Sequence, residues 1–482
     1  DNPGDGTPLR AWMRVEMSPI ETIDIGPTNQ HDLVLFANTT MSDSVSADWI
    51  NRFYLGGVDE YKYKLRTDNK DNMFVCGTYR DHMIVNYNLD LNEKYSVVLD
   101  EFGAPQDEPS SSSSGENSQA FVTMHDPTSG QIVTCLSTRG HGKNRGSSAI
   151  ADSKGDIYMV GQVSGKVRFV ADHGWWKFAE RGVNTGSTNN TFGFLAKATN
   201  REWMIDNSTK YKPIDYTWEW IVYIDAPEHS LSGERMLCDV SVSTNDDVYT
   251  VGYFNGPTEI GMSGAAKYND SETFQFEPGY KWVDESDEQV FICKWSDAGK
   301  CVWSSVYGVT GLDHDNINII FHDDMMYFVC AADTFAASTT ESGVVVSCVD
   351  ITTGDFTWVK SIQGGSITCS SIKVTDTGNI FITGVCDSTV TSSNITLGGG
   401  AVVEATSGYS LLLEPTGSSG VVTIFTSDSS TCDAVTQSNS TGKGVTIGTC
   451  DSTTTVQSGT QSIDIHTPEQ NKYFIYKSTH EL

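Results

Sequence analysis

The stretch Ala149–Gly161 reads AIADSKGDIYMVG: an apolar strand, a polar turn with Asp and Gly, and a second strand that ends in a small residue. Apolar residues on both sides of such a turn predict an antiparallel hairpin. The stretch Ile372–Gly384, IKVTDTGNIFITG, repeats the pattern far along the chain. Further copies are Leu65–Gly77, Val240–Gly252, Ile319–Ala331 and Ala434–Gly448, with a weaker copy at Ile23–Ala37. Recurrence of one hairpin indicates a repeat architecture.

A second hairpin pattern follows each copy except the weak first one and the last. Val290–Val306, VFICKWSDAGKCVWSSV, has an apolar strand, a turn with Asp and Gly, and a strand with Trp. The other copies are Ala120–Cys135, Phe194–Tyr223, Val344–Lys360 and Tyr409–Phe425. Four short antiparallel strands per repeat are typical of one β-propeller blade. We therefore predict an all-β propeller of seven four-stranded blades in a single domain, residues 1–482, with six blades and an N-terminal extension as the alternative.

The last repeat ends early. It has one strand, Tyr473–Lys477 (YFIYK), in place of the second hairpin. Ala11–Met17 (AWMRVEM) is an N-terminal strand that no repeat uses. We expect residues 11–17 to close the ring against residues 473–477.

These repeats resemble the SBBP-type β-propeller repeat family. DSKGDIYMVG and TDTGNIFITG match its D-x-x-G-N-Φ-Y-Φ-T-G unit, and VFICKWSDAGKCVWSSVYG matches the later strands with their Lys, Trp and Gly. The resemblance covers most of Leu65–Lys477, while the early repeats carry long insertions. It implies a propeller of the kind found in secreted and cell-surface proteins, and it transfers no catalytic residue.

The connections between strands differ in length. The first-to-second and third-to-fourth turns are tight, as at Asp152–Gly155 and Ser296–Gly299. Long insertions fall between the second and third strands, at residues 78–119, 162–191, 253–289 and 387–408. We expect them to elaborate one face of the disc, with a flexible Ser-rich loop at 104–119.

Composition limits the partners. With Lys+Arg 31 against Asp+Glu 62, the formal net charge is −31. Such a chain repels nucleic acid and anionic lipid, so we expect neither partner. The sequence contains no run of 18 or more apolar residues, so we expect no membrane span.

Two residue types favour the secretory route to the extracellular space or cell surface. Asn-X-Ser/Thr sequons for N-linked glycans occur at Asn38, Asn189, Asn207, Asn269, Asn394 and Asn439. Cysteines bracket hairpins, which predicts the disulfides Cys369–Cys386 and Cys432–Cys450 and a third pair, Cys293–Cys301. The chain begins at Asp1, which we interpret as a mature product without its leader.

The candidate ligand residues lie in links between repeats. Arg139, His141 and Arg145 fall in one link, His229 and Arg235 in a second, and His314 in a third. Together they would suit an anionic sugar. Asp313 and Asp315 are the candidate calcium ligands, because hard cations prefer carboxylate oxygens.

Three functions follow from these features. The first is an extracellular structural or adhesive glycoprotein that assembles with copies of itself or with other surface proteins. The alternatives are a lectin-like carbohydrate-binding propeller, and a hydrolase or lyase with its site at the mouth of the channel. The standard hydrolase, P-loop and zinc-protease motifs are missing, so we expect no catalytic residue set.

Overall fold

A computed structural model describes most of the repeats. The described residues are 32–37, 49–55, 63–68, 70–79, 82–87, 95–100, 118–126, 132–140, 142–164, 166–171, 181–184, 191–201, 215–224, 233–262, 276–283, 287–336, 343–375, 377–398, 406–426, 430–437, 444–450, 454–458, 461–465 and 472–477. Within them the protein is all-β, as predicted, and the one helical element is the 3-10 turn η3 (His314–Asn316). No helix in this part of the chain is long and apolar enough to cross a membrane.

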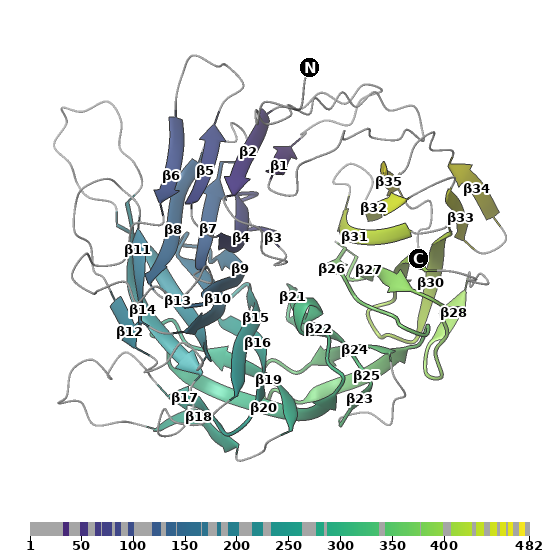
Figure 1. Ribbon diagram of the computed structural model, residues 1–482. Helices are drawn as coiled ribbons and strands as arrows, with labels where there is room; N and C mark the ends of the chain where they lie inside the picture. The colour runs from purple at the N-terminus through teal and green to yellow at the C-terminus, as the bar shows by residue number, and fades with distance from the viewer. Residues whose placement is uncertain are drawn as a thin grey trace. The chain divides into compact units, whose positions relative to one another are not determined.

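Five four-stranded antiparallel modules follow one another along the chain (Figure 1). Module A consists of β3 (Lys64–Thr67), β4 (Met73–Tyr79), β7 (Gln119–His125) and β8 (Ile132–Gly140). Module B consists of β9 (Arg145–Ala151), β10 (Ile157–Ser164), β13 (Thr191–Arg201) and β14 (Asp215–Ile224), and module C consists of β15 (Glu234–Val242), β16 (Val248–Asn255), β19 (Glu288–Trp295) and β20 (Cys301–Thr310). Module D consists of β21 (Asn318–His322), β22 (Met325–Ala332), β24 (Gly343–Val349) and β25 (Phe356–Ile362), and module E consists of β26 (Ser371–Val374), β27 (Ile380–Cys386), β29 (Ser407–Leu413) and β30 (Ser419–Thr426). In each module the strands pair in chain order.

Two incomplete modules flank these five. In the part of the chain that the structure describes, module F has three strands, β31 (Ser430–Gln437), β32 (Gly444–Cys450) and β35 (Lys472–Lys477). At the other end β1 (Asp32–Ala37) pairs with β2 (Trp49–Leu55). The predicted closing strand, residues 11–17, lies outside the described residues.

The chain forms two compact units. One contains residues 30–38 and 47–306, and the other contains residues 1–29, 39–46 and 307–482. Within the first unit β9 lies beside both β3 and β15, and within the second β26 lies beside both β21 and β31. The first strands of successive modules are therefore neighbours in each unit.

The first turn of a module is closed by its own side chains. Asp152 Oδ1 accepts hydrogen bonds from the backbone N–H groups of Lys154 and Asp156, at 3.0 and 2.9 Å. Asp68 caps the equivalent turn of module A in the same way. The third residue after the cap has a positive φ: 62° at Asp71 and 90° at Gly155. This backbone requirement explains the Asp and Gly of the repeated turn.

The small residue at the end of the hairpin pattern lets two backbones approach closely. A Cβ at Gly161 would lie 1.9 Å from the carbonyl oxygen of Arg145, and one at Gly384 would lie 1.9 Å from that of Thr368. In module B the β9–β10 register shifts beside Gly161. The glycine is thus required by a bulge against the first strand.

Modules B, C and D each contain the same row of side chains. A tyrosine of the second strand lies near a tryptophan of the fourth, with ring centroids 6.1 Å apart for Tyr158–Trp220, 6.1 Å for Tyr249–Trp303 and 6.2 Å for Tyr327–Trp358. The third-strand residue opposite the tyrosine is Lys197, Lys294 or Cys348, respectively. This row shows that the modules share one structural plan.

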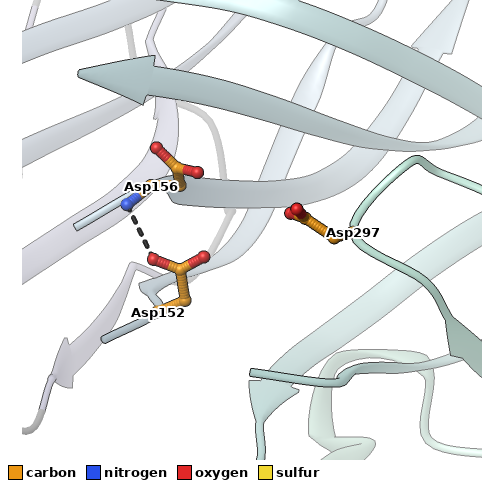
Figure 2. Close-up of side chains that lie close together, drawn as sticks. All are labelled: Asp152, Asp156 and Asp297. Carbon is orange, nitrogen blue, oxygen red and sulfur yellow. Dashed lines mark hydrogen bonds between the residues drawn. The ribbon is translucent and has the colours of Figure 1, made fainter. Parts of the chain in front are cut away.

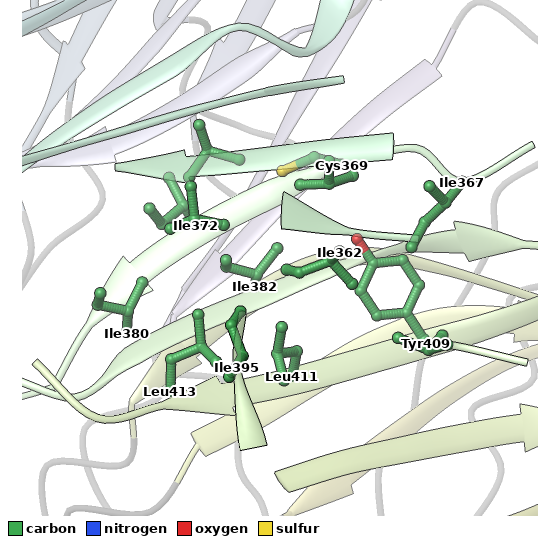
Figure 3. Packing of buried hydrophobic residues seen from close by; sticks show 14 of the residues in the cluster. Ile362, Ile367, Cys369, Ile372, Ile380, Ile382, Ile395, Tyr409, Leu411 and Leu413 are labelled. Atoms are coloured by element: carbon green, nitrogen blue, oxygen red, sulfur yellow. The ribbon is translucent and has the colours of Figure 1, made fainter. Parts of the chain in front are cut away.

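Apolar side chains fill the space between neighbouring strands and modules. Figure 3 shows part of the cluster in the second unit, where Ile372, Ile382, Leu411 and Tyr409 face one another. Each of these side chains is at most 5% exposed. Burial of one such side chain contributes about 1.5–3 kcal/mol.

The connections between second and third strands contain strands of their own. β5 (His82–Tyr87) and β6 (Tyr95–Asp100) lie between β4 and β7, yet β5 pairs with β2. β11 (Lys166–Ala171) and β12 (Arg181–Asn184) lie between β10 and β13, yet β11 pairs with β8 of module A. β33 (Thr454–Ser458) and β34 (Gln461–Ile465) lie between β32 and β35 of module F, yet β33 pairs with β30 of module E. The connection therefore reaches back to the outer strand of the preceding module.

Other connections reach back in the same direction. The hairpin of β17 (Thr258–Met262) and β18 (Phe276–Val283) in module C lies beside β14 of module B. β23 (Thr334–Phe335) pairs with the end of β20. In module E, Thr391 bridges to Gln363 just after β25, and β28 (Thr396–Gly398) pairs with β30 of its own module.

These strands change the interpretation of the predicted insertions. Where residues 78–119, 162–191 and 253–289 are described, they add strands next to preceding modules. Of the predicted flexible loop at 104–119, only Ser118 and Gln119 are described. Both are buried, and Gln119 begins β7. This pairing could not be predicted from the repeats, because each of these strands forms its hydrogen bonds with a strand of a neighbouring module and has no equivalent in the other repeats.

Candidate functional site

Three carboxylates gather at the turn end of modules B and C. Asp152 and Asp156 lie on the turn between β9 and β10, and Asp297 lies on the turn between β19 and β20 (Figure 2). Ligand oxygens of all three lie within 4.8 Å of one another. Carboxylates so close together need a cation to offset their repulsion.

Lys197 of β13 supplies that cation. Its Nζ lies 3.0 Å from Asp156 Oδ2 and forms a shorter contact with Asp297 Oδ1. Glu219 lies 3.4 Å from the same nitrogen. The Lys197 side chain is only 3% exposed, so the ammonium group is enclosed by the carboxylates and the sheet.

Hydrogen bonds from module B also hold the Asp297 turn. The Tyr158 hydroxyl lies 3.3 Å from both Asp152 Oδ2 and Asp297 Oδ1. Trp220 Nε1 donates to the carbonyl oxygen of Asp297 at 2.9 Å. A Cβ at Gly299 would lie 3.0 Å from the Trp220 ring. The cluster therefore joins two adjacent modules.

The electrostatics agree with a closed ion network. The hydrogen bond from Lys197 lowers the pKa of Asp297 below its usual value. Burial would lower the pKa of Lys197, but its hydrogen bonds to Asp297 and Asp156 outweigh burial and raise that pKa. Burial raises the pKa of Asp152 above its usual value. The group that carries the positive charge is thus held protonated.

Module C repeats the pair without the extra carboxylates. Lys294 Nζ lies 2.6 Å from Asp247 Oδ2 and 5.4 Å from the centroid of the Tyr249 ring. In module B the corresponding Lys197–Tyr158 distance is 5.6 Å. Since the Lys–Asp–Tyr arrangement recurs in two modules, it is a packing element of the repeat. A divalent cation bound by the three aspartates would have to displace Lys197, so these residues do not fit a metal site.

A second ion cluster joins modules A and C. Lys64 Nζ lies 2.9 Å from Asp239 Oδ2, and Arg66 Nη2 donates to the same oxygen. Asp239 has no exposed side-chain surface, and its Oδ1 accepts from Val240 N at 2.9 Å. Burial lowers the pKa of Lys64 to about 8, although Asp239 opposes the shift. The two clusters are what sequence analysis missed, although the Lys and Trp of the second pattern were a visible signal of the first.

The predicted calcium ligands hold a turn. Asp313 caps η3: its Oδ1 accepts from Asp315 N at 3.3 Å, and its Oδ2 accepts from Asn316 Nδ2 at 2.5 Å. Asp315 is exposed, and His314 is half-buried in the same turn. Among the described residues, Asp313, His314 and Asp315 belong to no group of three His, Cys, Asp or Glu ligand atoms that all lie within 4.8 Å of one another.

The other predicted ligand residues do not form a ring in the described part of the chain. Arg235 is fully buried; it donates to Thr258 Oγ1 at 3.1 Å and to the carbonyl oxygens of Gly233 and Pro257 at 3.1 and 2.6 Å. It therefore fixes the start of the β17 hairpin. Arg145 is half-buried at the start of β9. The Arg139 side chain and all of His141 and His229 lie outside the described residues.

The described cysteines are thiols, and the predicted disulfides are not formed among them. Ten cysteines are buried: Cys76, Cys135, Cys238, Cys293, Cys301, Cys330, Cys348, Cys369, Cys386 and Cys432. Cys386 Sγ donates to the carbonyl oxygen of Ser407 at 3.6 Å, and Cys369 Sγ lies 3.9 Å from that of Ser371, so the two thiols face different strands. Cys293 and Cys301 lie within hydrogen-bonding reach of each other, and burial raises the pKa of Cys293. The Cys450 side chain lies outside the described residues.

One sequon is fully described. Asn394 is exposed, and its Oδ1 accepts from Ser361 N at 3.2 Å. This bond orients the amide while leaving the nitrogen that would carry a glycan on the other side of the group. Asn38, Asn189, Asn207, Asn269 and Asn439 lie outside the described residues.

No model of a known family matches the chain. A search of curated proteins also finds no match. The resemblance to the SBBP-type repeats therefore stays a prediction.

Proposed function

We propose that the protein is an extracellular structural or adhesive glycoprotein, a β-propeller that assembles with copies of itself. The observation that carries this proposal is that the charged clusters hold modules together. In the described residues both clusters with enclosed charge, around Lys197 and around Asp239, join one module to another. Their charged groups pair with each other instead of facing a substrate.

The arrangement of modules supports the propeller. Four-stranded antiparallel sheets follow in series, and their first strands are neighbours within each unit. Such modules stack face to face in a propeller, because each leaves apolar surface that a neighbour must cover. The three-stranded module F supports closure by a strand from elsewhere in the chain, for which residues 11–17 are our candidate.

The surface chemistry supports an extracellular scaffold. The chain has a net charge of −31, six sequons and an exposed Asn394. High charge and glycans keep a protein soluble at high local concentration. The membrane-span and nucleic-acid roles gain no support from this composition.

Sedimentation velocity of the natively glycosylated protein over a wide concentration range tests the proposal. We expect a reversible monomer–oligomer equilibrium that persists after enzymatic removal of N-glycans. A glycan array is run in parallel. A protein that stays monomeric at every concentration but binds a defined glycan would overturn assembly in favour of a lectin.

A further inference from the structure

Two cations of β3 share one carboxylate of β15. Lys64 Nζ lies 2.9 Å from Asp239 Oδ2, and Arg66 Nη2 donates a hydrogen bond to the same oxygen. The Asp239 side chain has no exposed surface. Both cations are therefore held against the same buried oxygen, where they are also close to each other.

Of the two cations, Lys64 is the one that can lose its proton. A guanidinium group stays protonated in proteins, whereas a lysine releases its proton when burial or a neighbouring cation disfavours its charge. Burial lowers the pKa of Lys64 to about 8; Asp239 opposes this shift, and Arg66 adds to it. When Lys64 is neutral, Arg66 still pairs with Asp239, so the buried carboxylate keeps a charged partner.

The other ionisable groups around Lys64 lie on β4, β15 and β9. Cys76 of β4 is the cross-strand partner of Lys64, and burial raises the pKa of its thiol, which therefore carries no charge. The Cys238 thiol of β15 favours the charged form of Lys64, but less than Asp239 does. The strand β9, which lies beside β3, has Arg145 as its one ionisable residue, and this is a further cation. These groups leave Lys64 with a single carboxylate partner.

Lys64 is also partly accessible to solvent. Its side chain is 23% exposed, whereas the Lys197 side chain is 3% exposed. Lys294 is 17% exposed and pairs with Asp247 at 2.6 Å. Burial would lower the pKa of Lys294, but its hydrogen bonds to Asp247 and Tyr249 outweigh burial and raise that pKa. Lys294 is thus a lysine of similar exposure that retains its proton.

We propose that Lys64 is a covalent modification site for aldehydes, including the open-chain form of reducing sugars. The neutral Nζ attacks the carbonyl carbon, a C–N bond forms, and a proton moves from nitrogen to the carbonyl oxygen to give a carbinolamine. The carbinolamine loses its hydroxyl group and the second amine proton as water. The product is a neutral imine on Lys64, and the site is independent of the proposed self-assembly.

Charge favours an aldehyde over other electrophiles. A neutral imine removes one of the two positive charges beside Asp239 and leaves the Arg66 pair in place. An aldehyde is itself uncharged, so the chain's net charge of −31 does not repel it as it repels an anionic reagent.

Brief labelling of the full chain with glycolaldehyde and cyanoborohydride at neutral pH tests the site. The hydride donor reduces the imine to a stable secondary amine, and peptide mass spectrometry locates it. We expect Lys64 to be labelled at least about tenfold faster than Lys294, because a much larger fraction of Lys64 is neutral. The labelling rate of Lys64 should level off above a pH of about 8, while that of Lys294 continues to rise. In denaturant the two rates should become equal.

Two variants of Arg66 separate charge from exposure. Arg66→Met removes the second cation and should slow the labelling of Lys64 at least about threefold, whereas Arg66→Lys keeps a positive group and should preserve it. Equal rates for Lys64 and Lys294 in the folded wild type would overturn the proposal, and this comparison does not depend on the folding of a variant. An Arg66→Met protein that labels Lys64 as fast as wild type would overturn the shared carboxylate as the origin of the reactivity.

Discussion

Replacing Lys197 with Met removes the cation at the centre of the carboxylate cluster and nearly preserves side-chain length. The Lys197 side chain is 3% exposed, and its ammonium group is held by the side chains of Asp156, which is 14% exposed, and Asp297, which is 57% exposed. Loss of one partner of a fully buried pair costs about 3–5 kcal/mol. Solvent around Asp297 screens part of this, so we expect a loss of about 2–3 kcal/mol.

The matched control is Lys294→Met in module C. Lys294 has the same position over a tyrosine, but it is 17% exposed and pairs with one half-exposed carboxylate, Asp247. Its loss should cost about 1 kcal/mol. Thermal unfolding monitored by tryptophan fluorescence should therefore show a melting temperature that is lower by roughly 5–10 °C for Lys197→Met and by roughly 2–4 °C for Lys294→Met.

The pH dependence gives a second readout of the same cluster. Lys197 holds the pKa of Asp297 below its unfolded value of about 3.9. The ionised form of Asp297 therefore stabilises the fold above that pH, and this contribution is lost as the pH falls through the lower pKa that Asp297 has in the folded protein. The difference in the free energy of unfolding between wild type and Lys197→Met should therefore become smaller as the pH is lowered from neutral to about 3. Equal losses in the two lysine variants, with no pH dependence, would refute the ion-network interpretation.

The remaining predictions concern backbone geometry and the sequon. Gly161→Ala should destabilise the protein by about 2 kcal/mol or more through a clash with the Arg145 carbonyl. Gly398→Ala, whose added Cβ would lie 3.8 Å from the Gly420 carbonyl oxygen, should be nearly neutral in urea unfolding. Asp71→Gly should stabilise by about 0.5–1 kcal/mol because φ is 62° there, while Gly155→Ala should cost about 1 kcal/mol; the opposite signs in thermal melting would contradict the turn argument. Asn394→Gln should remove one glycan from the mass of natively produced protein, and an unchanged mass would show that the site is not used.

The hairpins were predictable because their determinants are local. The cap at Asp152, the positive φ at Gly155 and the alternating apolar residues all lie within Ala149–Gly161. Six copies of this pattern form the first two strands of modules A to F. Local signals of this kind fix register and face together.

The pairing of β11 with β8 was not predictable, because it joins residues of different repeats. Lys166–Ala171 has no copy elsewhere in the chain and so gave no repeat signal. Its long connection was interpreted as a surface loop from length alone. Hydrogen bonding of the preceding module's open edge is the physical reason that it forms a strand.

The charged site was only partly predictable. Lys197 appears in the repeat pattern, but its partner Asp297 lies in the next module, where only the three-dimensional structure shows it. Arg235 was chosen for its charge in a link between repeats, yet its donors are used by nearby backbone carbonyl groups. Cysteine spacing likewise placed Cys369 and Cys386 at one end of a hairpin, without showing which strand each thiol faces.

The central claim, a propeller that assembles through its own modules, is tested most directly by an electron-microscopy density map of the natively glycosylated protein. The account predicts successive four-stranded sheets around one axis, β11 continuing the sheet of module A, and a second copy in contact with the first. Sheets that do not surround a common axis, or isolated single copies at concentrations well above those of sedimentation, would contradict it.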